Sequence, residues 1–211
     1  MERWLALLCC VLWACGGGGG ANIKPSQALR KPDDLSPGDY AVAVAAYQDA
    51  CDDDDDDGCA YLAFMSDNGF GVKQDLDAAV ALSERSCGEG SAYGCAYLGY
   101  LHRIGRGVPQ DDARAATLFR RACEDDEVSG CVGLAIMYKS GSGVPNDLEQ
   151  AVSLFRRGCD LGDPLACYSL GYMYANGEGV DRDLDQAAQL FHTACASGDT
   201  VGCDAEASLG H

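Results

Sequence analysis

Cysteine is the residue whose number and spacing could do chemistry in this sequence. The chain of 211 residues has 13 cysteines, and ten of them form five pairs whose members are eight positions apart. Each pair begins 36 residues after the previous one. Paired thiols can ligate a metal ion or oxidise to a disulfide. The five pairs are Cys51 and Cys59, Cys87 and Cys95, Cys123 and Cys131, Cys159 and Cys167, and Cys195 and Cys203.

Zinc fits this spacing poorly. Structural zinc sites generally use close pairs such as Cys-x2-Cys that converge on one ion. The three histidines, His102, His192 and His211, share no position relative to the cysteine pairs. We therefore expect disulfides, with no metal centre and no cofactor.

The first cysteine pair encloses six consecutive aspartates, Asp52 to Asp57. Residues 53–58 read D-x-D-x-D-G, the first half of an EF-hand calcium loop, which needs a bidentate Glu at its twelfth position. That position is Phe64 here, and any run of Asp matches the first half. The sequence favours a solvated, self-repelling loop, and a calcium-responsive scaffold is an alternative.

The strict period of 36 residues indicates a repeat protein, whose units must position these cysteines. Four copies contain a Gly-x-Gly-Val segment with an aspartate three residues after the valine: GFGVKQD, GRGVPQD, GSGVPND and GEGVDRD. Glycine closes a helix C-terminus in the left-handed conformation, and Asp suits the N-cap of the next helix. Each unit is therefore predicted to be a helix, a turn and a second helix.

Both predicted helices are amphipathic, so the sequence predicts an all-α solenoid. The first helix of a unit, helix A, carries Leu and then Leu or Met three residues later, whereas the second, helix B, carries Ala and then Leu. The A pairs are Leu62 and Met65, Leu98 and Leu101, Leu134 and Met137, and Leu170 and Met173; the B pairs are Ala79 and Leu82, Ala115 and Leu118, Ala151 and Leu154, and Ala187 and Leu190.

One elongated domain, residues 39–211, accounts for all copies of the unit. It comprises a half repeat at 39–50, which is a solitary B helix, four repeats at 51–194, and a C-terminal capping helix at 195–211. Ten helices are therefore expected. Stacked units can bury a continuous core although each unit alone is marginal.

The run LGYLHRIGRGVPQDDARAATLFRRAC resembles the Sel-1-like repeat, a relative of the tetratricopeptide repeat, and similar runs cover residues 39–209. The added Cys-x7-Cys bracket resembles the Helicobacter cysteine-rich protein family. The resemblance implies a right-handed α/α solenoid in which disulfides tie the B helix of one unit to the A helix of the next. The tyrosine of the family's LGxxY motif is kept as Tyr138 and Tyr174 but is replaced by His102 and Ser66.

The N-terminus is consistent with export, which disulfides also require. Residues 1–14 read as a signal peptide, because one Arg precedes an apolar run that is too short to span a membrane. The LWAC segment resembles a bacterial lipobox and predicts lipidation of Cys15. Removal of Cys9 and Cys10 with the signal peptide, and acylation of Cys15, leave ten cysteines for five bridges.

Residues 15–38 are predicted to be the lipidated cysteine and a flexible Gly- and Pro-rich tether that holds the solenoid off a membrane. The protein is therefore expected in the periplasm or at the outer membrane as a lipoprotein, with soluble secretion as the alternative. The absence of Asp at position 16 implies the outer membrane, by resemblance to Gram-negative lipoproteins. The lipid anchor is the only membrane attachment expected, and the protein is expected to be a monomer.

Charge and motifs exclude several functions. The chain has 33 acidic and 15 basic residues, a formal net charge of -18, and no basic stripe that would bind nucleic acid. Resemblance to the cysteine-rich family implies penicillin binding and β-lactam hydrolysis, yet only Ser66-Asp67-Asn68 matches the serine β-lactamase motifs. No lysine has a serine three positions before it, and Lys-Thr-Gly is missing. We expect no catalytic residues, with a β-lactam- or peptidoglycan-directed activity as the alternative.

The variable face of the A helices is the candidate binding surface. Tyrosine supplies rigid contact area and a hydroxyl, and repeat solenoids bind ligands on a concave face. The sequence therefore predicts a non-catalytic scaffold of the bacterial cell envelope that binds a protein, a peptide or a cell-wall fragment. Burial of the same rings between units is the alternative. The candidate groove residues are Tyr61, Phe64, Tyr97, Tyr100, Ser169 and Tyr172.

Overall fold

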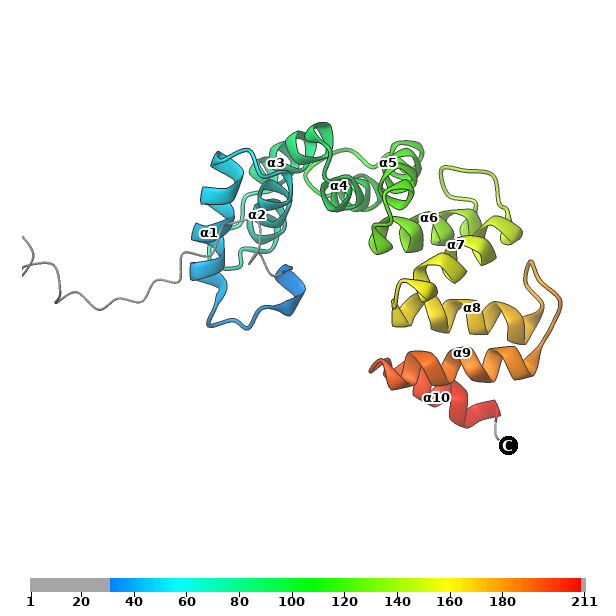
Figure 1. The fold of residues 1–211 in the computed structure, drawn as a ribbon. Coiled ribbons are helices and arrows are strands. Elements are labelled where there is room, and N and C mark those ends of the chain that lie inside the picture. The colour runs from blue at the N-terminus through cyan, green and yellow to red at the C-terminus, as the bar shows by residue number, and fades with distance from the viewer. Residues whose placement is uncertain (1–30, 210–211) are drawn as a thin grey trace, which may run out of the picture.

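The computed structural model describes residues 31–209, and in this part of the chain all regular secondary structure is helical (Figure 1). No helix in it is long and apolar enough to cross a membrane. A short 3-10 helix, η2 (Pro32–Asp34), precedes ten α-helices. They are α1 (Tyr40–Asp52), α2 (Asp56–Asn68), α3 (Leu76–Glu89), α4 (Ala92–Ile104), α5 (Asp112–Glu124), α6 (Val128–Ser140), α7 (Leu148–Asp160), α8 (Pro164–Asn176), α9 (Leu184–Ala196) and α10 (Thr200–Leu209).

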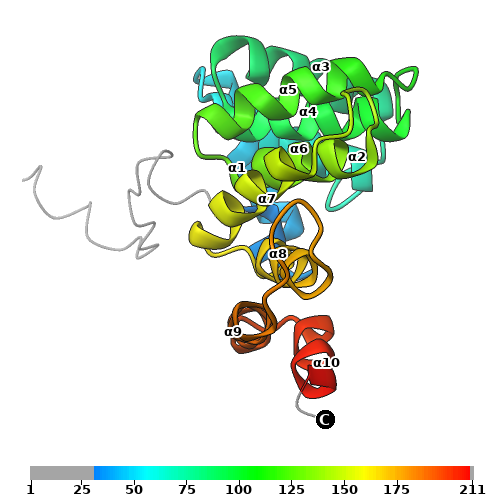
Figure 2. The same cartoon turned by 90° about the vertical axis from the view of Figure 1, so that its right-hand side faces the viewer.

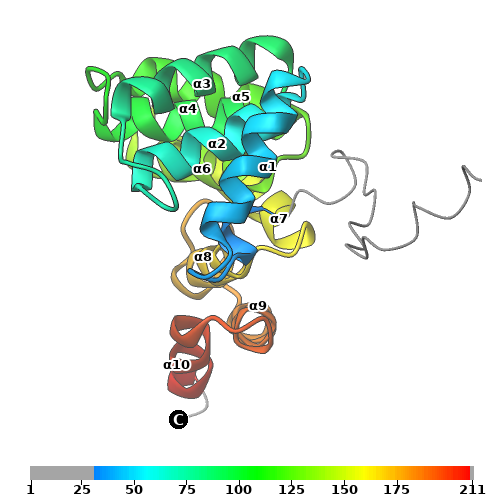
Figure 3. The same cartoon turned by 90° about the vertical axis from the view of Figure 1, so that its left-hand side faces the viewer.

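The helices stack as a curved α/α solenoid, which confirms the predicted fold class (Figure 1). Even-numbered helices are the A helices and odd-numbered helices are the B helices. The backbones of α2 and α4, of α4 and α6, and of α8 and α10 approach one another, and no two B helices make comparable contact in the described part. The A helices therefore line the inner, concave face. Helices α8 to α10 lie below the first six helices in both side views (Figures 2 and 3).

Helix ends lie where the repeated turn segments predict them. Each A helix from α2 to α8 ends at a glycine with a φ between 67° and 75°, a left-handed conformation that costs little without a Cβ. Each following B helix begins after an aspartate whose carboxylate accepts a backbone N–H from the first turn. The turn thus fixes the angle between the two helices of a unit.

Every junction between a B helix and the next A helix carries one disulfide. The structure joins the two cysteines of each bracket, with Cα–Cα distances of 4.4 to 4.6 Å. Small residues allow this close approach: a Cβ on Gly130 would lie 2.5 Å from the Cβ of Ala122. At the next junction the two residue types are exchanged, because Gly158 faces Ala166 there.

The core is formed by the predicted A-helix positions and by the B-helix alanines, all of which are buried. The predicted B-helix leucines are only partly buried. The residue after each of the last three leucines is buried more deeply: Phe119, Phe155 and Phe191. A B helix packs against the A helices on both sides of it, so its buried arc is wider than a simple amphipathic stripe and includes the phenylalanines.

Residues 31–35 lie against the solenoid, although the sequence assigns them to the tether. Helix η2 contacts α2, and Leu35 packs with the apolar cluster that contains Tyr47 and Tyr61. Leu35 gives this short segment an apolar side chain to bury. The predicted signal peptide, the lipidation site Cys15 and the first part of the tether lie outside the described residues, as do residues 210–211 of the capping helix.

Candidate functional site

A groove of about 440 Å³ lies on the inner face between α4, α6 and the start of α8. Tyr97 and Tyr100 line one wall, whereas Ile136 and Leu165 line the other side. The floor includes the ring of Phe119 beside Gly133. The surface of the groove is mainly apolar, with arginine and aspartate side chains at its edges.

The groove lies where one repeat position changes from a large side chain in α2 and α4 to a small one in α6 and α8, where it is Ser169. Tyr61 and Tyr97 occupy equivalent positions of α2 and α4, and the next equivalent position, in α6, is Gly133. A Cβ at Gly133 would lie 2.8 Å from the ring of Phe119, closer than ordinary van der Waals contact. The missing side chain therefore lets the buried ring of Phe119 pack closely beneath the groove. Helices α6 and α8 also make less contact than the other neighbouring A helices, which widens the groove on that side.

A stripe of large apolar residues runs along the inner face at one repeat position. Phe64, Tyr100, Ile136 and Tyr172 are each 36 residues apart, on α2, α4, α6 and α8. Tyr100, Ile136 and Tyr172, together with the neighbouring Leu165, are between 39% and 51% exposed. Exposed apolar residues scattered singly are ordinary, whereas several of them at one repeat position of a concave face are typical of an interaction surface.

The structure brings together three of the six predicted groove residues. Phe64, Tyr97 and Tyr100 line the groove, and ring centroids are 5.7 Å apart for Phe64–Tyr97 and 6.1 Å for Tyr97–Tyr100. Tyr61 is buried instead, because its ring packs between those of Tyr47 and Tyr93.

The other two predicted groove residues lie on α8 and do not line the groove. Tyr172 is exposed farther along the stripe, where the ammonium group of Lys139 lies 4.6 Å from the centre of its ring. Ser169 is partly buried on the same helix.

A buried ionic network stabilises the end of the groove near α2. The carboxylate of Asp67 accepts a hydrogen bond of 2.6 Å from the Tyr97 hydroxyl and another from the Arg106 guanidinium, which also donates to the Asp67 carbonyl oxygen. The Asp67 side chain is 3% exposed, whereas that of Arg106 is 36% exposed. Burial, with the hydrogen bond to Asp67, raises the pKa of Tyr97. The hydrogen bond to Asp67 also raises the pKa of Arg106.

This network gives Asp67 a structural role in the Ser-Asp-Asn triplet. Ser66 is also buried, and the amide of Asn68 donates to the carbonyl oxygen of Phe64 within the last turn of α2. The Asp67 carboxylate is already engaged by two donors from the next repeat. The triplet is therefore the end of a helix and forms no arrangement typical of a nucleophile and its base.

The aspartate run is a helix start with structural contacts. Asp55 caps α2 by accepting the N–H of Gly58, and Asp57 accepts the hydroxyl of Ser91 at 2.6 Å. Asp54 has a φ of 60° and pairs with Arg85 at 2.8 Å. Burial raises the pKa of Asp56, and Glu89 adds to this shift.

The Asp54–Arg85 pairing recurs two repeats later. Asp126 has a φ of 59° and pairs with Arg157 at 2.6 Å, whereas glycine occupies this left-handed position in the other brackets. Within residues 31–209 no group of three or more His, Cys, Asp or Glu side chains is arranged to hold a metal ion.

Sequence reasoning missed several groove residues. Arg103, Arg106, Ile136 and Leu165 all line it. Ile136 stands at the repeat position of Phe64, Tyr100 and Tyr172 but is not aromatic. Comparison of equivalent repeat positions was the signal that could have found the groove, because the position changes from Tyr61 and Tyr97 to the small residues Gly133 and Ser169.

Three solved structures are similar to this fold. The c5321 protective antigen of uropathogenic Escherichia coli, which displays an SLR fold, is 29% identical with a TM-score of 0.68 over 77% of this chain and 35% of its own, so this chain spans about a third of it. A Sel1 repeat protein from Oxalobacter formigenes is 26% identical with a TM-score of 0.71, over 79% of this chain and 67% of its own. Helicobacter pylori cysteine-rich protein B is 29% identical with a TM-score of 0.50, over 63% of this chain and 96% of its own.

Sequence comparison with curated proteins finds no match. The Sel1 repeat family model matches four consecutive segments, residues 56–91, 92–127, 128–163 and 164–199. Each segment begins at or next to the first residue of an A helix and ends just before the next A helix. The chain therefore belongs to the Sel1 repeat family.

Proposed function

We propose that this protein is a non-catalytic scaffold that binds an extended protein or peptide segment in the groove between α4, α6 and α8. Sel1 repeats mediate protein–protein interaction, which supports a protein partner. The observation that carries the proposal is the apolar hollow at Gly133, bordered by the exposed side chains of Tyr100, Ile136 and Leu165. A pocket for one or two apolar side chains inside a polar rim is the usual anatomy of a peptide site.

The surface chemistry favours a peptide over a cell-wall fragment. Apolar side chains of a peptide would cover the exposed side chains of Ile136 and Leu165, whereas a glycan would place hydroxyl groups against them without hydrogen-bond partners. Arg103 stacks near Tyr100, 5.8 Å from its ring centre, and supplies a polar edge. No contact in the described residues supports the β-lactam-directed or calcium-responsive alternatives.

Export and lipid anchoring are part of the proposal. Five disulfides in one chain support folding in an oxidising compartment, and the predicted lipobox supports an anchor at Cys15. Incorporation of labelled palmitate in cells, lost in Cys15→Ser, is the expected result. Palmitate that remains in Cys15→Ser would refute the anchor.

Selection from a random peptide library tests the groove. We expect selected peptides to carry apolar anchor residues and to lose about tenfold or more in affinity for Ile136→Asp, because a charge would replace a central anchor contact. The matched control is Val42→Asp, which adds the same charge on α1, where Val42 is 75% exposed. Equal losses in the two variants would refute binding in the groove.

Purified protein is expected to show no turnover of a chromogenic cephalosporin above the rate in buffer. Turnover that persists through purification and is lost on changing one residue would refute the non-catalytic assignment.

A further inference from the structure

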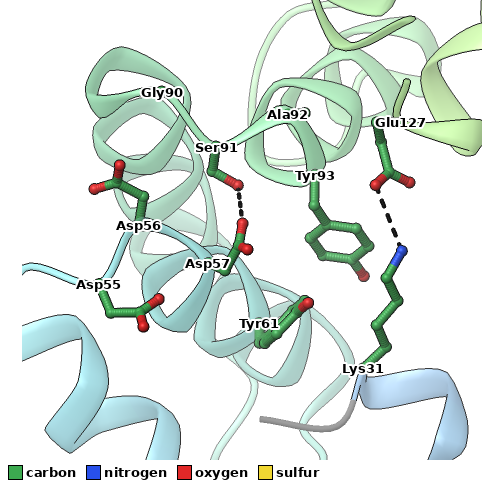
Figure 4. A pocket seen from close by; sticks show the side chains of 10 residues that line it. All are labelled: Lys31, Asp55, Asp56, Asp57, Tyr61, Gly90, Ser91, Ala92, Tyr93 and Glu127. Carbon is green, nitrogen blue, oxygen red and sulfur yellow. Dashed lines mark hydrogen bonds and ion pairs between the residues drawn. The ribbon is translucent and has the colours of Figure 1, made fainter. Parts of the chain in front are cut away.

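A second pocket, of about 390 Å³, lies where the N-terminal ends of α2, α4 and α6 meet beside residue 31 (Figure 4). Its lining combines carboxylates with two tyrosine rings. Glu127 and Asp57 supply carboxylates, Tyr61 and Tyr93 supply the rings, and the side chain of Lys31 enters from the segment before α1.

The two carboxylate oxygens of Glu127 accept hydrogen bonds from different residues. Oε1 accepts hydrogen bonds from the hydroxyl of Ser129 at 2.6 Å and from its backbone N–H at 3.4 Å, and so caps α6. Oε2 accepts from the ammonium group of Lys31 at 3.4 Å. The Glu127 side chain is only 12% exposed, so its charge is partly shielded from water. An ammonium group here is therefore held more strongly than at an open surface.

One tyrosine ring contacts the ammonium group, and a second ring packs behind it. The Lys31 nitrogen lies 5.5 Å from the centre of the Tyr93 ring, within the range of a cation–π contact. The ring of Tyr61 meets that of Tyr93 edge-on, with centroids 5.0 Å apart. Burial and the charges of Asp57 and Glu127 raise the pKa of Tyr61 to about 12, as expected where the local potential is negative.

The ammonium group of Lys31 can be displaced from the pocket by another cation. The Lys31 side chain is 47% exposed, and among residues 31–209 Lys31 is the only cationic residue that lines the pocket. Tyr93 lines both this pocket and the groove, so the two are continuous along α4. A segment lying in the groove can thus reach the pocket with a side chain.

We propose that this pocket binds the ammonium group of a lysine on the partner segment, and that Lys31 occupies it until that segment binds. The peptide part rests on the proposed function, whereas the ammonium site stands on its own contacts. Aromatic rings beside the carboxylates suit an organic cation, because a metal ion requires several oxygen ligands. Three of the lining carboxylates, Asp55, Asp57 and Glu127, already accept hydrogen bonds from protein donors.

The test uses a probe too small to need the groove. Nα-acetyl-lysine N-methylamide is titrated into the full chain at about 0.15 M salt, and the backbone amide signals of Tyr93 and Ser129 are followed by NMR. In Lys31→Met, which keeps a long unbranched side chain without its charge, we expect an affinity about threefold or more higher than in the unmodified protein, because the resident competitor is removed. The norleucine analogue of the probe is expected to cause no shift.

Matched variants locate the site. In the Lys31→Met background, Glu127→Gln is expected to abolish probe binding while its side-chain oxygen can still cap α6. The control Glu124→Gln removes one charge from the last residue of α5, three positions away, and is expected to change nothing. Equal affinity with and without Lys31, equal losses in the two glutamine variants, or equal binding of the norleucine analogue would each overturn the ammonium site.

Peptide selection separately tests the proposal that the pocket binds a lysine of the partner segment. Peptides selected on the Lys31→Met protein are expected to be enriched in lysine relative to those selected on the same protein with Glu127→Gln. No enrichment would overturn the partner assignment. Failure of the groove itself is read separately from Ile136→Asp.

Discussion

Removing the charge of Asp67 should destabilise the protein far more than removing the charge of an exposed acid. Asp67→Asn keeps the size of the side chain but leaves the Arg106 guanidinium facing an amide. Breaking a buried ion pair by changing one partner costs about 3 to 5 kcal/mol. Because Arg106 is about one-third exposed and water can solvate part of its charge, we expect the lower end, about 3 kcal/mol. That is a large share of a typical total of about 5 to 15 kcal/mol.

Urea denaturation followed by circular dichroism measures this loss. Both tryptophans, Trp4 and Trp13, belong to the predicted signal peptide, so the assay does not use tryptophan fluorescence. A loss of about 3 kcal/mol corresponds to a midpoint lowered by roughly 1 M urea or more. The matched control is Glu178→Gln, which breaks a pair of 3.0 Å with Lys139 whose two side chains are each about one-third exposed. This control should cost less than about 1 kcal/mol.

A double-mutant cycle tests whether the network acts as a unit. Tyr97→Phe removes a donor to a buried carboxylate and should cost about 1.5 to 3 kcal/mol in the unmodified protein. In the Asp67→Asn background the same change should cost at least about 1 kcal/mol less, because the charged acceptor is gone. Equal costs of Tyr97→Phe in the two backgrounds, or a cost of Asp67→Asn no greater than that of Glu178→Gln, would refute the reasoning.

Three further predictions concern the bridges, the tyrosines and the groove. Replacing Cys123 and Cys131 together by Ser opens a loop of sequence separation 8 and should lower the free energy of unfolding by about 2.5 kcal/mol in urea titrations; no change would contradict a stabilising bridge. Stability should fall as the pH rises above about 10, because unfolded tyrosine loses its proton there, whereas Tyr61 and Tyr97 have raised pKa values in the folded state. For Tyr61, with a folded pKa of about 12, the loss should reach about 2 kcal/mol or less, and ultraviolet titration of Tyr61→Phe should lack one late-ionising group. Gly133→Tyr introduces the residue that the two preceding repeats carry at this position, should fill the hollow at a packing cost of about 1 to 3 kcal/mol, and should abolish binding of selected peptides; unchanged binding would exclude the hollow as the site.

The repeat and its faces could be predicted from the sequence because they depend on local rules. A glycine after a helix, an aspartate before one and a leucine every unit act within a few residues, so Gly105, Asp111 and Leu134 have the predicted roles. Phe119 escaped prediction because its burial depends on helices from two units meeting around it.

The candidate site was less predictable because it depends on what neighbouring repeats place side by side. Tyr61 and Tyr97 have the same position in their units, yet Tyr61 is covered by Tyr47 and Tyr93 whereas Tyr97 borders a hollow left by Gly133. No pattern within one unit indicates such a difference. The approach of Lys31 to Glu127, across 96 positions of sequence, is equally invisible to periodicity.

The short span of each disulfide has a consequence for biosynthesis. If the polypeptide is delivered N-terminus first, both thiols of one bracket emerge together, well before the following bracket, since 8 residues separate partners and 28 separate one bracket from the next. Correct partners are then the nearest available partners at every stage. Each disulfide can form soon after its two cysteines have crossed the membrane. The folded solenoid would then need little rearrangement of disulfides by an isomerase.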